Sequence, residues 1–204
     1  MGSLKVKVGD KKTEVPLFQE IKGVLIPLPN ATFENMLKVT PAELDRIFTA
    51  RVAPYYRSIG RMIVQCIGAS TDDNNHHLIP ISGHVMPVLL RHFLFRGVDP
   101  KDESYPIDDL IDHAFTTLMG MENMSREAAF EYFGIDPREY NDSGEAFRQV
   151  RYEIHEICIK ERSLALKALE EGLTLNGLSD LSFCCGLVPI EAINEVLFSD
   201  SYTV

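Results

Sequence analysis

Histidine and acidic side chains gather in one polar stretch of this 204-residue sequence, and they are the first candidates for chemistry. His76, His77 and His84 follow Asp72 and Asp73, a mixture of side chains that could mimic a set of metal ligands. Zinc sites, however, bring their ligands together in closer pairs, placed by a turn or by one face of a helix. We therefore expect these histidines to be solvated in a loop, and we predict no metal site.

A second arrangement, His84 or His113 with Asp112, would act as a general acid–base pair only if the fold placed it in a concave pocket. His92 and His113 fall in predicted helices, where polar faces or satisfied buried positions are the simpler expectation. The sequence contains no phosphate-binding glycine loop, dinucleotide fingerprint or nucleophilic-serine motif. It therefore predicts no catalytic residue and no cofactor.

The four cysteines of the chain are Cys66, Cys158, Cys184 and Cys185. They form no C-x-x-C pair, and two adjacent cysteines are poor partners for one another, so we expect reduced thiols in an intracellular protein, cytoplasmic or nuclear. Cys66 and Cys158 fall in apolar helical stripes, which predicts core positions. No histidine lies near Cys184 and Cys185 in the sequence to activate either thiol as a nucleophile.

The composition, 45% hydrophobic and 25% charged, is typical of a soluble globular protein. No apolar run reaches the roughly 18–20 residues of a membrane span, so we expect no membrane association. A net charge of -10 repels phosphate backbones, which argues against nucleic acid as a partner. We expect residues 1–3 to be left over from cloning and residues 4–204 to form a single domain.

The histidine, acidic and cysteine side chains are positioned by the fold. The spacing of apolar and turn residues predicts that this fold is mainly α with a small N-terminal β element (α+β). Leu4–Val8 alternates like a strand, and Gly23–Pro27 is a short apolar strand. Helices dominate after Asn30. The first full helix begins at Thr40, because Thr40, Pro41 and Glu43 form a capping box with proline in the first turn; its apolar stripe is Leu44, Ile47, Phe48 and Val52. Pro54 is expected to kink this helix or to open the next one.

A glycine in the middle of the following helix, "YYRSIGRMIVQCIGAS" (Tyr55–Ser70), requires an explanation. A glycine there costs about 1 kcal/mol relative to alanine. Gly60 lies within the apolar stripe, which comprises Tyr56, Ile59, Gly60, Ile63 and Ile67. We therefore predict a close helix–helix crossing at Gly60, where no side chain fits.

Further helices are predicted along the rest of the chain. Val85–Phe95 is apolar nearly all round and is expected to be buried. Ile107–Met119 and a short helix from Ser125 to Gly134 follow, and Glu145–Glu171 is predicted as the longest helix, with Gly172 as its stop. A last short helix is expected over Pro189–Leu197.

Five segments, in order, resemble the N-terminal lobe of HECT-type ubiquitin ligase domains. "YYRSIGRMIVQCI" (Tyr55–Ile67) is similar to the signature helix of that family, with Tyr56, Ile59, Gly60, Arg61 and Ile63 at matching positions. The resemblance implies a HECT N-lobe-like helical domain that contributes to protein ubiquitination, with ubiquitin or a ubiquitin-conjugating enzyme as candidate partners. The other four segments are Leu17–Thr32, Ile79–Gly97, Asp108–Met121 and Arg162–Leu173.

The sequence departs from the family pattern in two ways. The threonine-cysteine-phenylalanine-asparagine context of the family's catalytic cysteine does not occur, so Cys184 and Cys185 are not assigned that role. Only Glu122–Glu145 occupy the place of the subdomain that docks the conjugating enzyme, which puts that docking in doubt. The chain is therefore expected to position partners and not to be catalytic alone.

The segment "LMGMENM" (Leu118–Met124) and the aromatic residues after it combine flexible thioethers with rings, a combination suited to adaptable partner binding. The alternative is that these side chains simply cap the core. A further alternative for the whole chain is a stand-alone helical protein–protein interaction domain unrelated to ubiquitin. The predicted partner-binding residues are Met119, Met121, Met124, Phe130, Tyr132 and Phe133.

Overall fold

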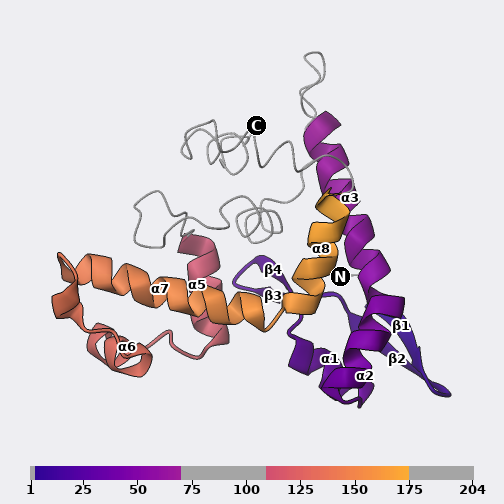
Figure 1. The fold of residues 1–204 in the computed structure, drawn as a ribbon, viewed down its shortest axis with the longest axis horizontal. Coiled ribbons are helices and arrows are strands. Elements are labelled where there is room, and N and C mark those ends of the chain that lie inside the picture. Colours follow the sequence, from indigo (N-terminus) through magenta and orange to yellow (C-terminus); the bar gives the residue numbers. More distant parts are fainter. Residues whose placement is uncertain (1–2, 70–108, 175–204) are drawn as a thin grey trace.

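The computed structural model describes residues 3–69 and 109–174, which form mostly helices and two short antiparallel hairpins (Figure 1). The mainly helical prediction with a small N-terminal β element is confirmed at this level. In the same two ranges, no helix is long and apolar enough to cross a membrane. The elements are β1 (Ser3–Val8), β2 (Lys11–Pro16), β3 (Phe18–Ile21), β4 (Val24–Pro27), α1 (Asn30–Leu37), α2 (Pro41–Ile47), the π-helical turn η1 (Phe48–Val52), α3 (Ala53–Ala69), α5 (Asp109–Leu118), α6 (Arg126–Phe133), the 3-10 turn η2 (Pro137–Glu139), α7 (Ser143–Lys160) and α8 (Ser163–Thr174).

The two hairpins form because their turns meet the backbone requirements of tight connections. Gly9, the first residue of the β1–β2 turn, has a φ of 58°, and the β3–β4 turn places Lys22 and Gly23 at φ values of 52° and 81°. Positive φ at these positions gives the two-residue turns whose twist matches antiparallel strands. Val6 and Val15, on one face of the first hairpin, are buried in the core.

The entry into α2 has the predicted capping box. The Thr40 hydroxyl accepts a hydrogen bond from the Glu43 amide (3.4 Å), and the Thr40 amide donates to the Glu43 carboxylate (3.0 Å). Pro54 lies at the second position of α3, directly after the π-helical turn η1 that leads into this helix. The wide turn η1, where the Ala53 amide bonds to the Phe48 carbonyl, joins α2 to α3.

The buried residues of the two described ranges fall into two hydrophobic cores, on either side of the β3–β4 hairpin (Figure 1). We call the first the α3/α8 half, built from β1, β2, α1, α2, η1, α3 and α8, and the second the α5–α7 half, built from α5, α6 and α7. The β3–β4 hairpin contributes to both, because Phe18 packs on the first core while Ile21 and Ile26 belong to the second.

The prediction of one long helix over Glu145–Glu171 is wrong, because the chain turns at Glu161 and Arg162 between α7 and α8. Figure 1 shows α8 leaving the end of α7 at a steep angle. The backbone carbonyl of Glu161 accepts a hydrogen bond from the Asn30 amide (2.8 Å), and the Asn30 side chain donates to the Ser163 hydroxyl (3.0 Å). A tertiary contact with the start of α1 thus replaces helical hydrogen bonding at this point.

Gly172, predicted to end that helix, lies instead inside α8, which continues to Thr174. The short helix from Ser125 to Gly134 is confirmed as α6, with the Ser125 hydroxyl accepting from the Ala128 amide (3.2 Å) and Gly134 closing it at a φ of 64°. The following predicted features lie outside the described residues: the helices Val85–Phe95 and Pro189–Leu197, the HECT-like segment Ile79–Gly97, Asp72, Asp73, His76, His77, His84, His92, Cys184 and Cys185.

Candidate functional site

Helices α3 and α8 cross closely at Gly60 and Gly172. A Cβ atom added to Gly60 would lie 2.6 Å from the Leu169 carbonyl oxygen, and one added to Gly172 would lie 2.2 Å from the Arg57 carbonyl oxygen. Ordinary Cβ contacts are 3.4–4 Å, so neither position has room for a side chain. Gly60 is buried, and the predicted packing role of this residue is confirmed.

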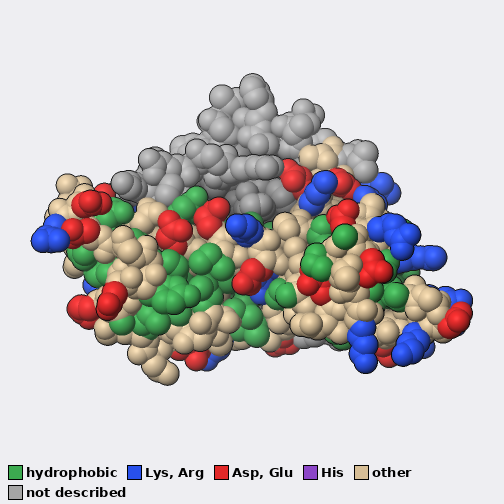
Figure 2. Space-filling view, turned by 60° about the horizontal axis from the view of Figure 1, so that its bottom comes forward, with side chains coloured by type: hydrophobic (Ala, Val, Ile, Leu, Met, Phe, Trp, Pro, Cys, Tyr) green, Lys and Arg blue, Asp and Glu red, His purple; other side chains and the backbone are tan. Residues whose placement is uncertain are grey.

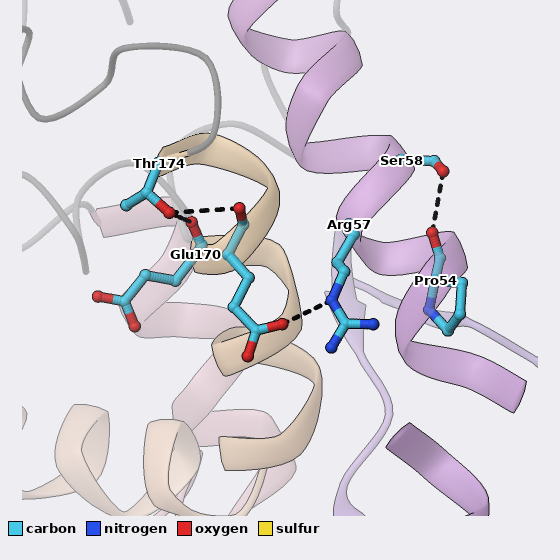
Figure 3. A network of polar contacts seen from close by, with 6 residues as sticks. Pro54, Arg57, Ser58, Glu170 and Thr174 are labelled. Carbon is cyan, nitrogen blue, oxygen red and sulfur yellow. Dashed lines mark hydrogen bonds and ion pairs between the residues drawn. The ribbon is translucent and has the colours of Figure 1, made fainter. Parts of the chain in front are cut away.

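Polar side chains line the rim of this crossing (Figure 3). Arg57 Nε of α3 lies 2.5 Å from the Glu171 carboxylate of α8, and both side chains remain partly exposed. Two further hydrogen bonds lie within single helices: the Thr174 hydroxyl donates to the Glu170 carbonyl (2.9 Å) in α8, and the Ser58 hydroxyl donates to the Pro54 carbonyl (2.9 Å) on the side of α3 away from α8 (Figure 3). Because an ion pair at the surface contributes little stability, we attribute the separation of the two helices to the glycines.

Aromatic rings fill the core below the crossing. Phe48 stacks on Tyr56 with centroids 5.9 Å apart, and Phe33 and Phe18 meet these two rings edge-on at 5.2 and 5.5 Å, respectively. The Tyr56 hydroxyl donates to the Leu17 carbonyl, which satisfies its one polar group. Burial raises the pKa of the Tyr56 phenol, so it stays protonated and serves the packing.

A buried arginine, which sequence reasoning missed, joins the two halves. Arg162 is 2% exposed, and its guanidinium donates to the carbonyls of Pro27 (3.0 Å) and Cys158 (2.7 Å) and to the carboxylate of Glu161 (3.3 Å). Burial lowers the pKa of Arg162, yet the hydrogen bonds compensate a charge that would otherwise be costly to bury. The sequence does contain a sign that Arg162 is buried. Arg162 follows Ile154 and Cys158 at helical spacing, so it lies on the same face as these apolar residues.

The six predicted partner-binding residues lie in the α5–α6 loop and on α6, but in different environments. Met121 and Phe130 are buried in the core of the α5–α7 half, and Met119 and Phe133 pack against that core while remaining partly exposed. Met124 and Tyr132 are exposed, at 38% and 64%. Figure 2 shows hydrophobic side chains gathered on the surface of this half of the molecule.

The end of α5 explains why Met121 turns inward. Gly120 has a φ of 68° and the Met121 amide bonds to the Thr116 carbonyl (3.0 Å), a Schellman motif that closes α5. Ile135 repeats the pattern after α6, where its amide bonds to the Phe130 carbonyl (2.9 Å). Such motifs fold the first residue after the left-handed position back onto the helix, and Met121 is that residue.

Glu122 of the α5–α6 loop makes polar contacts with α5 and with the β3–β4 turn. The Thr117 hydroxyl donates to the Glu122 carboxylate (2.5 Å), and the Lys22 ammonium of the β3–β4 turn lies 3.1 Å from the same oxygen. The hydrogen bond from Thr117 and then that from Lys22 lower the pKa of Glu122. The exposed Met124 therefore follows a loop that has polar contacts both to α5 and to the β3–β4 turn.

Of the residues considered for chemistry, the structure describes the side chains of His113 and Cys158, while Asp112 and Cys66 lie in helices at positions whose side chains are not described. His113 is exposed on α5, and Cys158 is fully buried, where burial raises the pKa of its thiol to about 12. A thiol of that pKa is almost entirely protonated at neutral pH, so Cys158 is a core residue as predicted. Within residues 3–69 and 109–174, no group of three or more His, Cys, Asp or Glu side chains could hold a metal ion.

Comparison of the chain with protein families, with curated proteins and with solved structures gave no match. The α3–α8 crossing and the partly exposed surface formed by Met119, Met124, Tyr132 and Phe133, which we call the α5–α6 surface, are therefore the features on which a function can be argued.

Proposed function

We propose that this chain is a non-catalytic module of the HECT N-terminal-lobe type, which positions protein partners for ubiquitin transfer carried out by a separate catalytic lobe. The observation that supports it best is the contact between two of the five family-like segments. Tyr55–Ile67 and Arg162–Leu173 are more than 90 residues apart in the sequence, yet they cross backbone to backbone at Gly60 and Gly172.

Positioning requires a frame that does not deform when partners bind. The α3–α8 crossing and the Arg162 junction supply it, because both fix helices through contacts that tolerate little displacement. Holding two reactants in the right geometry lowers a barrier by several kcal/mol without any reacting group on the scaffold. A lobe of this kind therefore contributes to ligation through geometry.

The α5–α6 surface is the proposed contact for ubiquitin or for a conjugating enzyme. Tyr132 offers a large exposed ring that is braced edge-on by Phe133, with ring centroids 4.9 Å apart. Tyrosine and methionine are both enriched in the buried centres of interfaces, tyrosine because its ring supplies contact area at low entropic cost and methionine because its flexible thioether adapts to the partner. The Met124 and Tyr132 side chains are the most accessible of the predicted set.

Titration of ubiquitin, and separately of a ubiquitin-charged conjugating enzyme, into the chain would test this proposal by NMR or calorimetry. We expect reversible binding to at least one of them and no reducible thioester on the chain. The double variant Met124→Ala/Tyr132→Ala should weaken binding at least ten-fold. The control Tyr55→Ala/Met62→Ala removes the same residue types from exposed positions of α3 and should leave binding unchanged. A thioester lost on replacing one cysteine, or equal weakening by both variants, would contradict the proposal.

A second candidate is a stand-alone helical interaction domain unrelated to ubiquitin. The segment between α5 and α7 favours it, since α6 and η2 pack directly on α7 and leave little of the family's docking subdomain. This candidate predicts that neither ubiquitin nor a conjugating enzyme binds, while a different protein is captured through the α5–α6 surface and released by Tyr132→Ala.

A further inference from the structure

The β1–β2 hairpin carries a charge opposite to that of the chain as a whole. Lys5, Lys7, Lys11 and Lys12 are four of only 20 basic residues, whereas the same hairpin holds two of the 30 acidic residues. The chain has a net charge of -10, so this basic segment stands out against an acidic background. All four lysines are exposed.

The strand register places three of these lysines on one face. Lys7 lies directly opposite Lys12, and Lys5 lies opposite Glu14. Because side chains alternate along a strand, these positions point away from the buried Val6. The hairpin projects from the α3/α8 half in Figure 1, and basic side chains gather at that end of the molecule in Figure 2.

Glu14 is the one acidic residue among the strand residues of this face, which therefore carries three lysines against one carboxylate. In the part of the chain that the structure describes, no ion pair involves Lys5, Lys7 or Lys12, and the Glu14 carboxylate accepts a hydrogen bond from the Ser3 hydroxyl. Like charges directly opposite one another destabilise an antiparallel pair. The Lys7–Lys12 pair therefore opposes hairpin formation, and a negatively charged occupant would reverse that effect.

We infer that the outer face of the β1–β2 hairpin binds an acidic, extended protein segment. Lys5 and Lys7 are two residues apart on a strand, a spacing of about 7 Å that matches carboxylates at alternate positions of an extended chain. Nucleic acid fits less well, since no arginine and no aromatic ring lies on either strand. The site is separate from the α5–α6 surface and does not depend on the proposed role in ubiquitination.

Fluorescence anisotropy with a labelled peptide of alternating glutamate and threonine tests this inference. We expect saturable binding that weakens as salt rises, because exposed charges are screened. The variant Lys5→Glu/Lys7→Glu/Lys12→Glu should bind at least ten-fold more weakly. The control Lys38→Glu/Lys160→Glu/Lys167→Glu makes the same change in net charge at exposed positions elsewhere and should bind within two-fold of the unaltered chain.

Four outcomes would overturn the inference. Three of these are absence of peptide binding, equal weakening by the hairpin variant and the control, and tighter binding to single-stranded RNA or to vesicles of phosphatidylserine and phosphatidylcholine. The fourth is salt-dependent self-association that is lost in the hairpin variant, which would assign the face to a second copy of the chain. Met124→Ala/Tyr132→Ala should bind the peptide normally, which separates this result from failure of the proposed function. Circular dichroism of each variant confirms that it is folded.

Discussion

The two halves of the molecule close their cores by different means. The α3/α8 half joins segments more than 100 residues apart, as the Arg57–Glu171 pair shows, and its helices meet backbone to backbone. The α5–α7 half is assembled chiefly from residues close together in the sequence, and its helices meet through rings and thioethers. Packing in the first half therefore requires that Gly60 and Gly172 have no side chain. Packing in the second half requires large side chains between the helices.

Adding a side chain at the crossing should break the first half. Gly172→Val would place branched carbons against the Arg57 carbonyl, which is 2.2 Å from the ideal Cβ position, and we expect the free energy of unfolding to fall by about 3 kcal/mol or more. Gly144→Ala in α7 is the control, because its Cβ would meet only the capping side chain of Asp142, at 3.0 Å, and no backbone atom, so a much smaller loss is expected. Urea unfolding that shows equal losses for the two variants would contradict the comparison.

Removing side chains should distinguish core from surface in the second half. Phe130→Ala should lower the free energy of unfolding by about 3 kcal/mol, since Phe130 is buried among Phe147 and the α7 side chains. Tyr132→Ala, two residues away on the exposed face, should change it by less than about 0.5 kcal/mol. A large loss for Tyr132→Ala would mean that its ring serves the core and is not free to bind a partner.

The junction between the halves should be sensitive to loss of the buried guanidinium. Arg162→Met leaves the Pro27 and Cys158 carbonyls without a donor, and we expect a loss of about 2 kcal/mol in unfolding free energy. Arg138→Met, which removes an exposed arginine paired with Asp136, should cost less than about 0.5 kcal/mol. Thermal unfolding followed by circular dichroism measures both losses. Similar losses for the two variants would show that Arg162 does not stabilise the contact between the halves.

A small gain in stability is expected at the end of α1. Lys38 adopts a φ of 55°, a left-handed conformation that costs a residue with a Cβ more than it costs glycine. Lys38→Gly should therefore raise the free energy of unfolding by about 0.5–1 kcal/mol, whereas Lys160→Gly, in the last turn of α7, should lower it by about 1 kcal/mol. Chemical denaturation that finds a loss at both positions would contradict this reading of the α1 terminus.

Local signals were sufficient to predict elements whose ends are set by neighbouring residues. The Thr40 capping box and the Ser125–Gly134 helix are of this kind, because the groups that satisfy each terminus lie within four residues of it. Gly60 was predictable for a related reason: a glycine inside an apolar stripe has a cost that only close packing explains. In each case the residue type itself carried the information.

The break between α7 and α8 was not predictable in this way. The α7 pattern continues through Arg162 with helical spacing, and the groups that end the helix, Asn30 and Pro27, lie more than 100 residues away in the sequence. The same limit applies to the methionine and aromatic cluster. Spacing marked six apolar residues, but only the Schellman turn at Gly120 decided that Met121 faces the core while Met124 remains exposed.

The contact between Gly60 and Gly172 is the central claim, and a double-mutant cycle tests it most directly. Gly60→Ala and Gly172→Ala should each lower the free energy of unfolding, although alanine is the better helix former by about 1 kcal/mol. Because either change forces the same two helices apart, the double variant should lose at least about 1 kcal/mol less than the sum of the single losses. Strictly additive losses, or a gain in stability from either alanine, would contradict the account.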